Sequence, residues 1–337
     1  MSEKHRMVIV GGGFGGLYCA QSLRKTPVQV TLVDRRNFHL FQPLLYQVAA
    51  GELSPANIAA PLRAVLERHA NVEVLMGEVC GFDLAGRRVL LTDGDIAYDT
   101  LIVAAGSETS YFGHGEWELT APGLKTIEEA TDIRHRVLVA FETAERQRNA
   151  AQVGRQLTFV VIGGGPTGVE MAGAVAEMAK HTLRGEFRWI DPARARIFLI
   201  EGGDRVLNAF PTSISDRATT QLEQLGVILR LKTLVTDVRP DGVTIRCGEQ
   251  TEEIAAATLI WAAGVRASPL GKVLAGAAGV QPDRQGRVVV GPDLSLPGHA
   301  EVFVIGDLAH TVLSPNTEPL PGLAPVAMQE GRYVAKL

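Results

Sequence analysis

The chain has 337 residues, of which 46% are hydrophobic and 21% charged, with a formal net charge of −4. This length suggests about two domains of ordinary globular composition, and the slight acidity argues against nucleic acid as a partner. The three cysteines, Cys19, Cys80 and Cys247, form no CxxC pair, which argues against a disulfide framework, a paired redox centre or a zinc site. We predict no bound metal.

The hydropathy pattern predicts no membrane-spanning segment. The N-terminus is too short and too charged for a signal peptide, because strand-like residues begin at Met7. There is no run of about 18 apolar residues, the minimum for a helix that crosses a bilayer. Attachment to a membrane surface needs no such helix and stays open.

The first elements along the chain are typical of a βαβ unit. We expect a buried parallel strand over Met7–Val10, a helix over Gly15–Lys25 and a second strand over Val28–Val33, which ends at Asp34.

The turn between this strand and helix contains Gly11, Gly13 and Gly16 and satisfies GxGxxG. The first glycine permits the tight turn, the second lets the backbone approach a diphosphate, and the third lets the helix pack closely on the strand. The helix N-terminus favours the negative charge of the diphosphate. Asp34, 18 positions after Gly16, is placed to accept hydrogen bonds from ribose hydroxyls. The turn therefore predicts a dinucleotide site.

Further strands and helices are expected up to the middle of the chain. They are a helix over Ile58–Arg68, strands over Val72–Gly77, Arg87–Leu91 and Leu101–Ala105, and a helix over Thr126–Arg148. The last of these is rich in Glu and Arg and is predicted to be a solvated helix.

The same order of elements then begins again. A strand over Leu157–Ile162, a helix over Val169–Lys180 and a strand over Arg196–Ile200 repeat the opening pattern. Thr258–Ala263 is followed by Gly264, as Leu101–Ala105 is followed by Gly106. The chain is therefore a tandem repeat of one plan, and we predict an α/β fold with two interleaved Rossmann-like dinucleotide-binding domains.

The second glycine turn contains Gly163, Gly165 and Gly168, and its acidic residue is Glu201. Glu201 lies 33 positions after Gly168, compared with about 20 in the usual pattern. Residues His181–Pro192 account for the excess as an insertion between helix and strand.

The carboxylate of Glu201 also bears on the choice of cofactor. It would repel the 2′-phosphate of NADPH, and the next three residues, Gly202, Gly203 and Asp204, supply no arginine. NADH is therefore the expected cofactor, although Arg205 makes this a preference.

Two dinucleotide sites in one chain indicate a resident flavin and a nicotinamide that exchanges, with hydride passing between stacked rings. Near the end of the chain, the apolar strand Val302–Ile305 leads into Gly306 and Asp307. Such a strand end can place a carboxylate and a glycine N–H near the ribityl and phosphate groups of a flavin. The pair therefore favours the flavin at the first turn.

The sequence resembles the type II NADH:quinone oxidoreductases, within the flavoproteins that have two dinucleotide-binding domains of the pyridine nucleotide-disulfide oxidoreductase type. The resemblance covers nearly all of the chain. The motifs that carry it are LIVAAGS, LIWAAGV and VFVIGD for the broad class, and Asn37–Arg63, Gly163–Met178 and Leu323–Ala335 for the narrower family.

The resemblance implies a flavoenzyme of the respiratory chain with FAD at the first turn and NADH at the second. Hydride passes from NADH to FAD, and two electrons pass to a membrane quinone, ubiquinone or menaquinone, without proton pumping. Carried over by position, the residues implied for FAD are Gly11, Gly13, Gly16, Asp34, Gly306 and Asp307, and those for NADH are Gly163, Gly165, Gly168 and Glu201.

The resemblance also implies catalytic residues. Glu170 matches a glutamate near the flavin that helps NADH binding or proton delivery to quinone; from the residues alone it also suits a helix N-terminus. Gln329 matches a glutamine near the quinone, whereas Pro325 replaces a second family glutamine one turn earlier. The residues Gln42, Pro43, Leu44 and Tyr46 are expected to line the flavin or quinone path, or to pack in the core.

The expected domains are residues 1–112 plus 266–337 for FAD and residues 113–265 for NADH. Family members continue past this point into helices that attach to the membrane, so this chain is expected to be either a fragment of such a protein or a member that lacks this region. The family location is peripheral, on the cytoplasmic side of the inner membrane, and a chain without the region is expected to be soluble. A homodimer is a further expectation.

Two other functions stay open on sequence grounds. One is an NAD(P)H-dependent reductase with a ferredoxin or rubredoxin as acceptor, which needs no cysteine pair. The other is a non-catalytic flavin-binding module, against which both cofactor motifs argue because they are intact.

Overall fold

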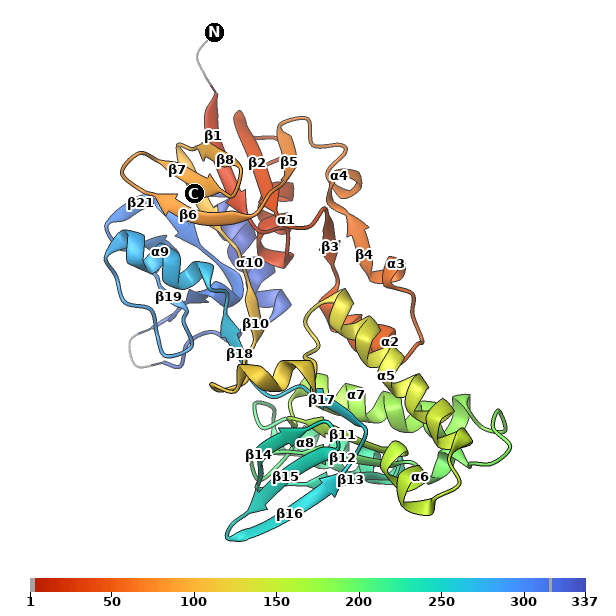
Figure 1. Ribbon diagram of the computed structural model, residues 1–337. Helices are drawn as coiled ribbons and strands as arrows, with labels where there is room; N and C mark the ends of the chain where they lie inside the picture. The colour runs from red at the N-terminus through yellow and green to blue at the C-terminus, as the bar shows by residue number, and fades with distance from the viewer. Residues whose placement is uncertain (1–3, 315–316) are drawn as a thin grey trace. The chain divides into compact units, whose positions relative to one another are not determined.

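The computed structural model, shown in Figure 1, describes residues 4–314 and 317–337. By their contacts the residues divide into two compact units. Unit 1 comprises Met1–Leu40, Ala59–Glu108 and Val265–Leu337, and unit 2 comprises Phe41–Ile58 and Thr109–Gly264. The chain enters each unit more than once, which confirms the interleaved α/β fold.

Unit 1 is built on a six-stranded sheet in the order β20-β21-β9-β1-β2-β5. All neighbouring strands are parallel except β20 and β21. The strands are β1 (His5–Val10), β2 (Val28–Asp34), β5 (Val72–Met76), β9 (Thr100–Val103), β20 (Ser295–Leu296) and β21 (His299–Val304). Because β1 lies between β2 and β9, the strand order reverses at its carboxyl end, where open α/β sheets bind ligands.

The apolar residues of β1 alternate between two core clusters. Val8 and Val10 pack with residues of the antiparallel sheet β6-β7-β8 and of α9 (Leu270–Ala278). Ile9 packs on the other face, with residues of α1 (Phe14–Ser22) and α10 (Ala324–Val334). The strand is therefore buried on both faces, as the apolar run predicted. The small sheet consists of β6 (Val79–Asp83), β7 (Arg88–Leu91) and β8 (Gly94–Ala97).

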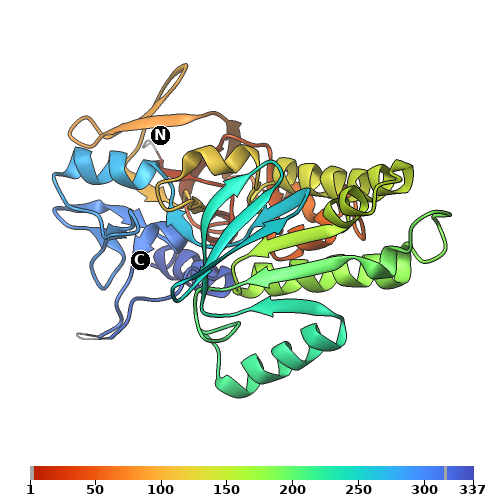
Figure 2. The same ribbon diagram turned by 60° about the horizontal axis from the view of Figure 1, so that its bottom comes forward.

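Unit 2 repeats this plan. Its parallel sheet has the order β13-β12-β11-β17, which corresponds strand for strand to β5-β2-β1-β9 of unit 1. An antiparallel sheet, β14-β15-β16, again packs with one face of it, and the helices α5 and α7 contact the parallel strands (Figure 2). The elements are α5 (Ile127–Arg146), β11 (Thr158–Ile162), α7 (Pro166–Glu177), β12 (Arg196–Ile200), β13 (Val227–Arg230), β14 (Thr233–Arg239), β15 (Gly242–Cys247), β16 (Gln250–Ala255) and β17 (Thr258–Trp261).

Smaller elements connect these layers. They are β3 (Phe38–Leu40), η1 (Gln42–Leu44), α2 (Leu45–Ala49), α3 (Pro55–Ile58), β4 (Ala59–Pro61), α4 (Leu62–Val65), β10 (Ser107–Thr109), η2 (Gly115–Leu119), α6 (Ala150–Gln156), η3 (Met178–Thr182), η4 (Pro192–Arg194), α8 (Thr212–Gln224), β18 (Val265–Ala267), β19 (Val288–Val289), η5 (Gly306–Leu308) and β22 (Ala309–His310).

Three expectations about these elements were wrong or incomplete. The helix predicted over Ile58–Arg68 does not form, because Pro61 cannot continue a helix interior; the residues form β4 and the short α4 instead. The helix α5 is not solvated all round, since Ile133, Val137 and Phe141 on one face are fully buried. Residues 41–58, assigned to the first domain from sequence, make their contacts within unit 2, where α2 packs on α5 and α7.

Among residues 4–314 and 317–337, no helix is both long enough and apolar enough to span a membrane.

Candidate functional site

The first glycine turn follows β1 and depends on two close backbone contacts. Gly11 has a φ of +105° and donates its N–H to the Val33 carbonyl oxygen at 2.7 Å. A Cβ on Gly11 would lie 2.3 Å from the Ala104 carbonyl oxygen, and one on Gly16 would lie 1.9 Å from the Gly11 carbonyl oxygen. Any larger residue at either position would displace the backbone.

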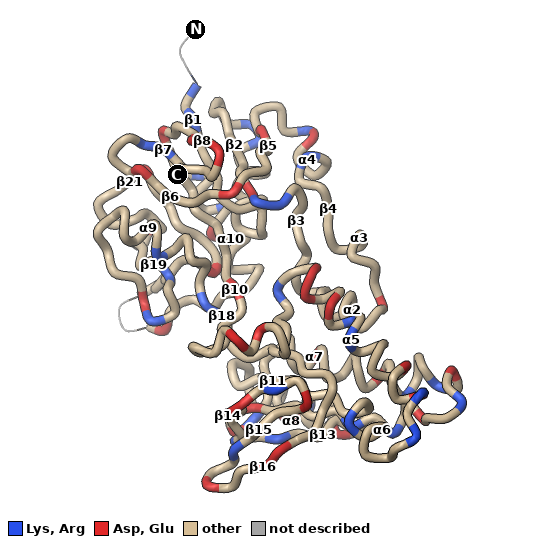
Figure 3. The backbone as a smooth tube through the Cα atoms, in the orientation of Figure 1, with Lys and Arg blue, Asp and Glu red and all other residues tan. Residues whose placement is uncertain are grey.

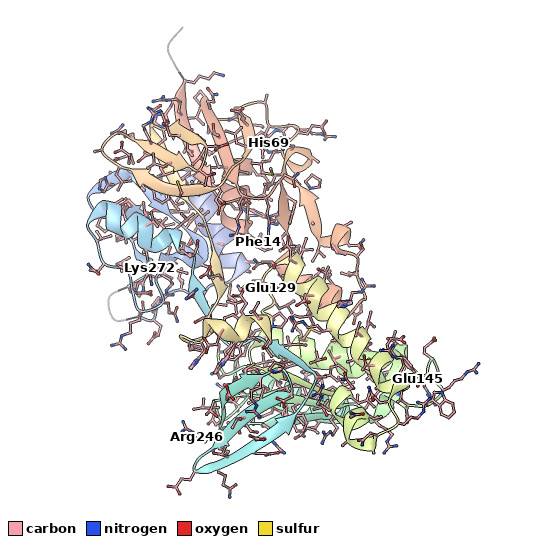
Figure 4. All side chains as sticks on the ribbon, in the orientation of Figure 1. Phe14, His69, Glu129, Glu145, Arg246 and Lys272 are labelled. Carbon is pink, nitrogen blue, oxygen red and sulfur yellow. The ribbon has the colours of Figure 1, made fainter. Side chains whose placement is uncertain are left out.

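Gly13 differs from these two glycines. It is the N-cap of α1, has a φ of −70° and caps with no side-chain hydrogen bond. A Cβ placed there would meet no protein atom within 4 Å. The turn therefore opens at the helix N-terminus, where backbone N–H groups can receive a diphosphate. This arrangement fits the dinucleotide that the sequence predicted at this turn. Phe14, the first residue of α1, is labelled in Figure 4.

Asp34, at the end of β2, contacts the turn directly. One carboxylate oxygen accepts the Gly12 N–H at 2.6 Å, and the other accepts the Arg36 N–H at 2.7 Å. The ring of His39 donates its Nδ1–H to the Gly12 carbonyl oxygen at 2.9 Å. Asp34 thus fixes the turn, and its contact with a ribose remains a prediction. The sequence analysis missed His39, whose only signal is its place three residues after the arginine pair that follows Asp34.

Gly306 and Asp307 lie after β21 in the same unit. Gly306 has a φ of +71° and donates its N–H to a carboxylate oxygen of Glu330 at 2.6 Å. Asp307 accepts a hydrogen bond of 2.6 Å from the Ser107 hydroxyl. The structure thus joins the end of LIVAAGS to the end of VFVIGD, 200 residues apart. Sequence reasoning singled out Asp307 but missed Ser107 and Glu330.

Gln329 lies on α10 and is exposed. Its side-chain nitrogen donates to the Pro325 carbonyl oxygen at 3.2 Å, within the same helix.

The second glycine turn, in unit 2, has the same geometry as the first. Gly163 has a φ of +110° and donates its N–H to the Ile200 carbonyl oxygen at 2.7 Å. A Cβ on Gly168 would lie 1.8 Å from the Gly163 carbonyl oxygen, whereas one on Gly165 would meet no atom within 4 Å. The helix α7 begins at this turn, so a second helix N-terminus is open to a diphosphate.

Glu201, at the end of β12, has the position that Asp34 has in unit 1. Its two carboxylate oxygens accept the N–H groups of Gly164 and Gly203, each at 2.6 Å. Arg205 donates its guanidinium hydrogens to the carbonyl oxygens of Asn208 and Phe210, at 2.7 and 2.9 Å. The one arginine that weakened the preference for NADH is therefore engaged by its own loop.

Glu170 lies near the start of α7, and α2 packs on the same helix. Glu170 is exposed to solvent, and partial desolvation by surrounding protein raises its pKa. The pKa of Tyr46, on α2, is raised first by burial and then by the charges of Glu170 and Glu52. The structure thus brings Tyr46 of the apolar stretch into the electrostatic neighbourhood of Glu170. Gln42, Pro43 and Leu44 form the short helix η1 just before α2, and none of the three is buried.

Comparisons with known proteins agree with this geometry. Residues 5–331 match the family described as pyridine nucleotide-disulphide oxidoreductase. The chain is 46% identical to the type II NADH:quinone oxidoreductase Ndh of Mycobacterium tuberculosis, over 99% of this chain and 72% of that protein. It is also 46% identical to NdhA of the same organism, over 98% of this chain and 70% of that protein.

Among solved structures, NDH2 from Plasmodium falciparum in complex with NADH has the same fold. It superposes with a TM-score of 0.89 at 21% identity and covers 99% of this chain and 83% of its own. The chain belongs to the pyridine nucleotide-disulphide oxidoreductase family and, within it, to the type II NADH:quinone oxidoreductases.

Proposed function

We propose that the protein is a FAD-dependent oxidoreductase that takes a hydride from NADH and passes two electrons to a membrane quinone without pumping protons. One observation carries the proposal: a chain 46% identical to type II NADH:quinone oxidoreductases has two glycine turns of the same geometry, each open at a helix N-terminus. When bound, FAD accepts the hydride and supplies the electrons to quinone.

The residues of unit 1 hold FAD in this proposal. Gly11 and Gly16 set the turn, and Gly13 leaves room for the diphosphate at the N-terminus of α1. Asp34 keeps the turn in place through Gly12 and would bind the ribose, and Asp307, which accepts a hydrogen bond from Ser107, would bind the ribityl and phosphate groups.

The residues of unit 2 hold NADH. Gly163, Gly165 and Gly168 form the corresponding diphosphate site, and Glu201 repels a 2′-phosphate. The engagement of Arg205 by two carbonyl oxygens leaves this carboxylate as the dominant charge of the turn, which supports NADH over NADPH.

Glu170 is the proposed proton donor for quinone. Reduction of a quinone to a quinol consumes two protons, and a carboxyl group with a raised pKa stays protonated to a higher pH. The charge of Glu170 also contributes to the raised pKa of Tyr46 on α2. The exposed Gln329 of α10 is proposed to contact the quinone.

The quinone itself, ubiquinone or menaquinone, dissolves in the bilayer, which supports a peripheral position at a membrane surface; the cytoplasmic face of the inner membrane is the proposed side. A homodimer is also proposed, and light scattering of the purified protein tests it.

A steady-state assay with purified protein tests the function. NADH is offered against NADPH as donor, and a soluble quinone against a ferredoxin and ferricyanide as acceptors. We expect the highest kcat/KM with NADH and quinone. If ferredoxin is reduced as fast as quinone or faster, the protein is instead a reductase with a ferredoxin as acceptor. If NADH does not bleach the yellow colour of the protein, it is a non-catalytic flavin-binding module.

The role of Glu170 is tested separately. Glu170→Gln keeps the size of the side chain but removes its proton, so quinone reduction should slow by about tenfold or more. It should also lose the pH dependence that the raised pKa gives the wild type. The matched control is Glu177→Gln, two turns further along α7. Unchanged quinone kinetics in Glu170→Gln would remove Glu170 from the site.

A further inference from the structure

Glu330 is a buried carboxylate that the proposed reaction does not use. It lies on α10 beside the exposed Gln329, yet only 7% of Glu330 is accessible to solvent. One carboxylate oxygen accepts the Gly306 N–H at 2.6 Å, and the other accepts the Thr311 hydroxyl at 3.0 Å. Burial of a charged group is costly unless it is hydrogen-bonded, so these two donors explain how the carboxylate is tolerated.

The charge at this position is not required for the packing of α10. Burial raises the pKa of Glu330, the hydrogen bonds from Gly306 and Thr311 oppose that rise, and the nearby Asp307 adds to it. An apolar side chain on the same face of the helix, Val334, is 3% exposed and packs without such costs. The hydrogen bonds that the carboxylate accepts from Gly306 and Thr311 therefore explain its presence at this position.

The carboxylate of Glu330 mainly stabilises the turn at Gly306. Its left-handed backbone, with a φ of +71°, directs the chain from β21 into Asp307. A Cβ on Gly306 would lie 3.3 Å from the Ala327 Cβ, so α10 also covers this turn. The next residue, Asp307, is held from its other side by Ser107.

The helix that carries Glu330 is itself fixed against the first glycine turn. A Cβ on Gly331 would lie 2.3 Å from the Gly15 carbonyl oxygen, so α10 touches the backbone of α1 near its start. Adjacent residues of α10 thus contact both turns of unit 1: Gly331 contacts the helix that starts at the first turn, and Glu330 contacts the turn that presents Asp307.

We propose that Glu330 is a positioning residue for FAD, whose carboxylate fixes the backbone of Gly306 so that Asp307 faces the cofactor. The proposal rests on the assignment of FAD to unit 1. Glu330 acts on the cofactor only through Gly306 and Asp307, and it takes no part in hydride or proton transfer.

Release of FAD from the holoprotein tests this role. The holoprotein is diluted, and the fluorescence of released FAD gives the dissociation constant for wild type, Glu330→Ala, Glu330→Gln and Val334→Ala. Glu330→Ala should weaken FAD binding by about tenfold or more, because it removes a hydrogen bond to a charged group and leaves the partly buried Gly306 N–H unpaired. Glu330→Gln should restore binding to within about threefold, since an amide oxygen still accepts from Gly306.

The matched control separates positioning from general loosening of α10. Val334→Ala removes buried packing from the same helix but no bond to Gly306, so it should lower the melting temperature and leave FAD affinity within about twofold of wild type. The proposal is overturned if Glu330→Ala binds FAD as tightly as wild type, or if Val334→Ala weakens FAD as much as Glu330→Ala does.

A milder variant keeps the test decisive if Glu330→Ala does not fold. Thr311→Val is nearly isosteric at a site only 5% exposed and removes the second donor to the carboxylate. It should weaken FAD by about threefold, in keeping with the loss of one hydrogen bond, and unchanged affinity would overturn the proposal. A wild-type protein that binds no FAD would instead contradict the proposed function itself.

Discussion

The two glycine turns have almost the same backbone and very different surroundings. The N–H of Gly11 and that of Gly163 each donate to a carbonyl oxygen of the neighbouring strand at a distance of 2.7 Å. Their φ angles are +105° and +110°. Each turn also receives a carboxylate from the end of the next strand, Asp34 or Glu201, at 2.6 Å.

The differences begin one layer outside the turn. In unit 1, His39 holds Gly12 from the carbonyl side, and Ser107, Asp307 and Glu330 form a second set of contacts at the end of β21. In unit 2 the Gly164 carbonyl oxygen is held by a backbone group instead, the Leu207 N–H at 2.8 Å, and Arg205 donates to carbonyl oxygens of its own loop. The side-chain contacts at the end of β21 therefore distinguish unit 1, and they suit a cofactor that stays bound.

Basic and acidic residues are interspersed along both units (Figure 3). The different roles proposed for the two turns therefore rest on a few placed carboxylates and not on the overall charge of either unit.

The largest expected effects come from substitutions that add a Cβ at the tightest backbone contact of each turn. Gly16→Ala and Gly168→Ala each place a Cβ within 2 Å of a backbone oxygen, at 1.9 and 1.8 Å. Gly16→Ala should yield protein without FAD, whereas Gly168→Ala should keep FAD and raise the KM for NADH by about a hundredfold, or about 2.7 kcal/mol, because the backbone of the turn is displaced. Absorbance of bound flavin and NADH kinetics measure the two effects. The opposite assignment would exchange these outcomes.

A second pair of substitutions tests whether the N-cap glycines of the two turns are required only for ligand binding and not for stability. Gly13→Ala and Gly165→Ala meet no protein atom within 4 Å, so the free energy of unfolding of the apoprotein should change by less than about 0.5 kcal/mol. FAD affinity should fall about tenfold in the first and NADH affinity about tenfold in the second, because the new methyl group occupies the space of the diphosphate. Chemical denaturation and ligand titration measure these effects; an equal loss of stability in both variants would assign the glycines a structural role.

Local features of the two turns could be predicted from the sequence, whereas contacts between distant residues could not. The glycines of both turns were predictable because each has a local steric reason, and Asp34 and Glu201 followed from their place at strand ends. His39, Ser107 and Glu330 were not, because their partners lie 27, 200 and 24 residues away and no periodicity marks them. The helix expected over Ile58–Arg68 failed for a local reason that the sequence did contain, the proline at position 61.

Glu201→Arg is expected to reverse the choice of nicotinamide. It removes the carboxylate that repels a 2′-phosphate and supplies a cation that binds it, so the ratio of kcat/KM for NADH to that for NADPH should fall by about a hundredfold, or about 2.7 kcal/mol. Arg205→Ala is the control, because its guanidinium already donates to the carbonyl oxygens of Asn208 and Phe210. A control that changes the ratio as much as Glu201→Arg would show that Arg205 sets the preference.

The smallest expected effect concerns a feature of unit 2 alone, the insertion between α7 and β12. Glu145, labelled in Figure 4 on α5, accepts the backbone N–H groups of Arg188, Trp189 and Ile190 at 2.9–3.1 Å. The guanidinium of Arg148 lies over the ring of Trp189, 4.8 Å from its centre. Trp189 is 71% exposed, whereas Trp117 and Trp261 are buried, so the part of the tryptophan emission that an aqueous quencher removes is a selective probe of this loop.

Desolvation raises the pKa of Glu145, but the three N–H groups and Arg148 outweigh it, and the net shift is downward. A carboxylate with a lowered pKa stabilises the folded loop above its ordinary pKa of 4.5 and loses that effect as the pH falls through the lower folded value. The fluorescence anisotropy of Trp189 should therefore drop below pH 4.5 in the wild type. It should be low at neutral pH in Glu145→Gln, which trypsin should also cleave faster after Arg188. Because the insertion has no counterpart at the first turn, FAD content should be the same in both proteins; a loss of FAD in Glu145→Gln would mean that the insertion supports more than its own unit.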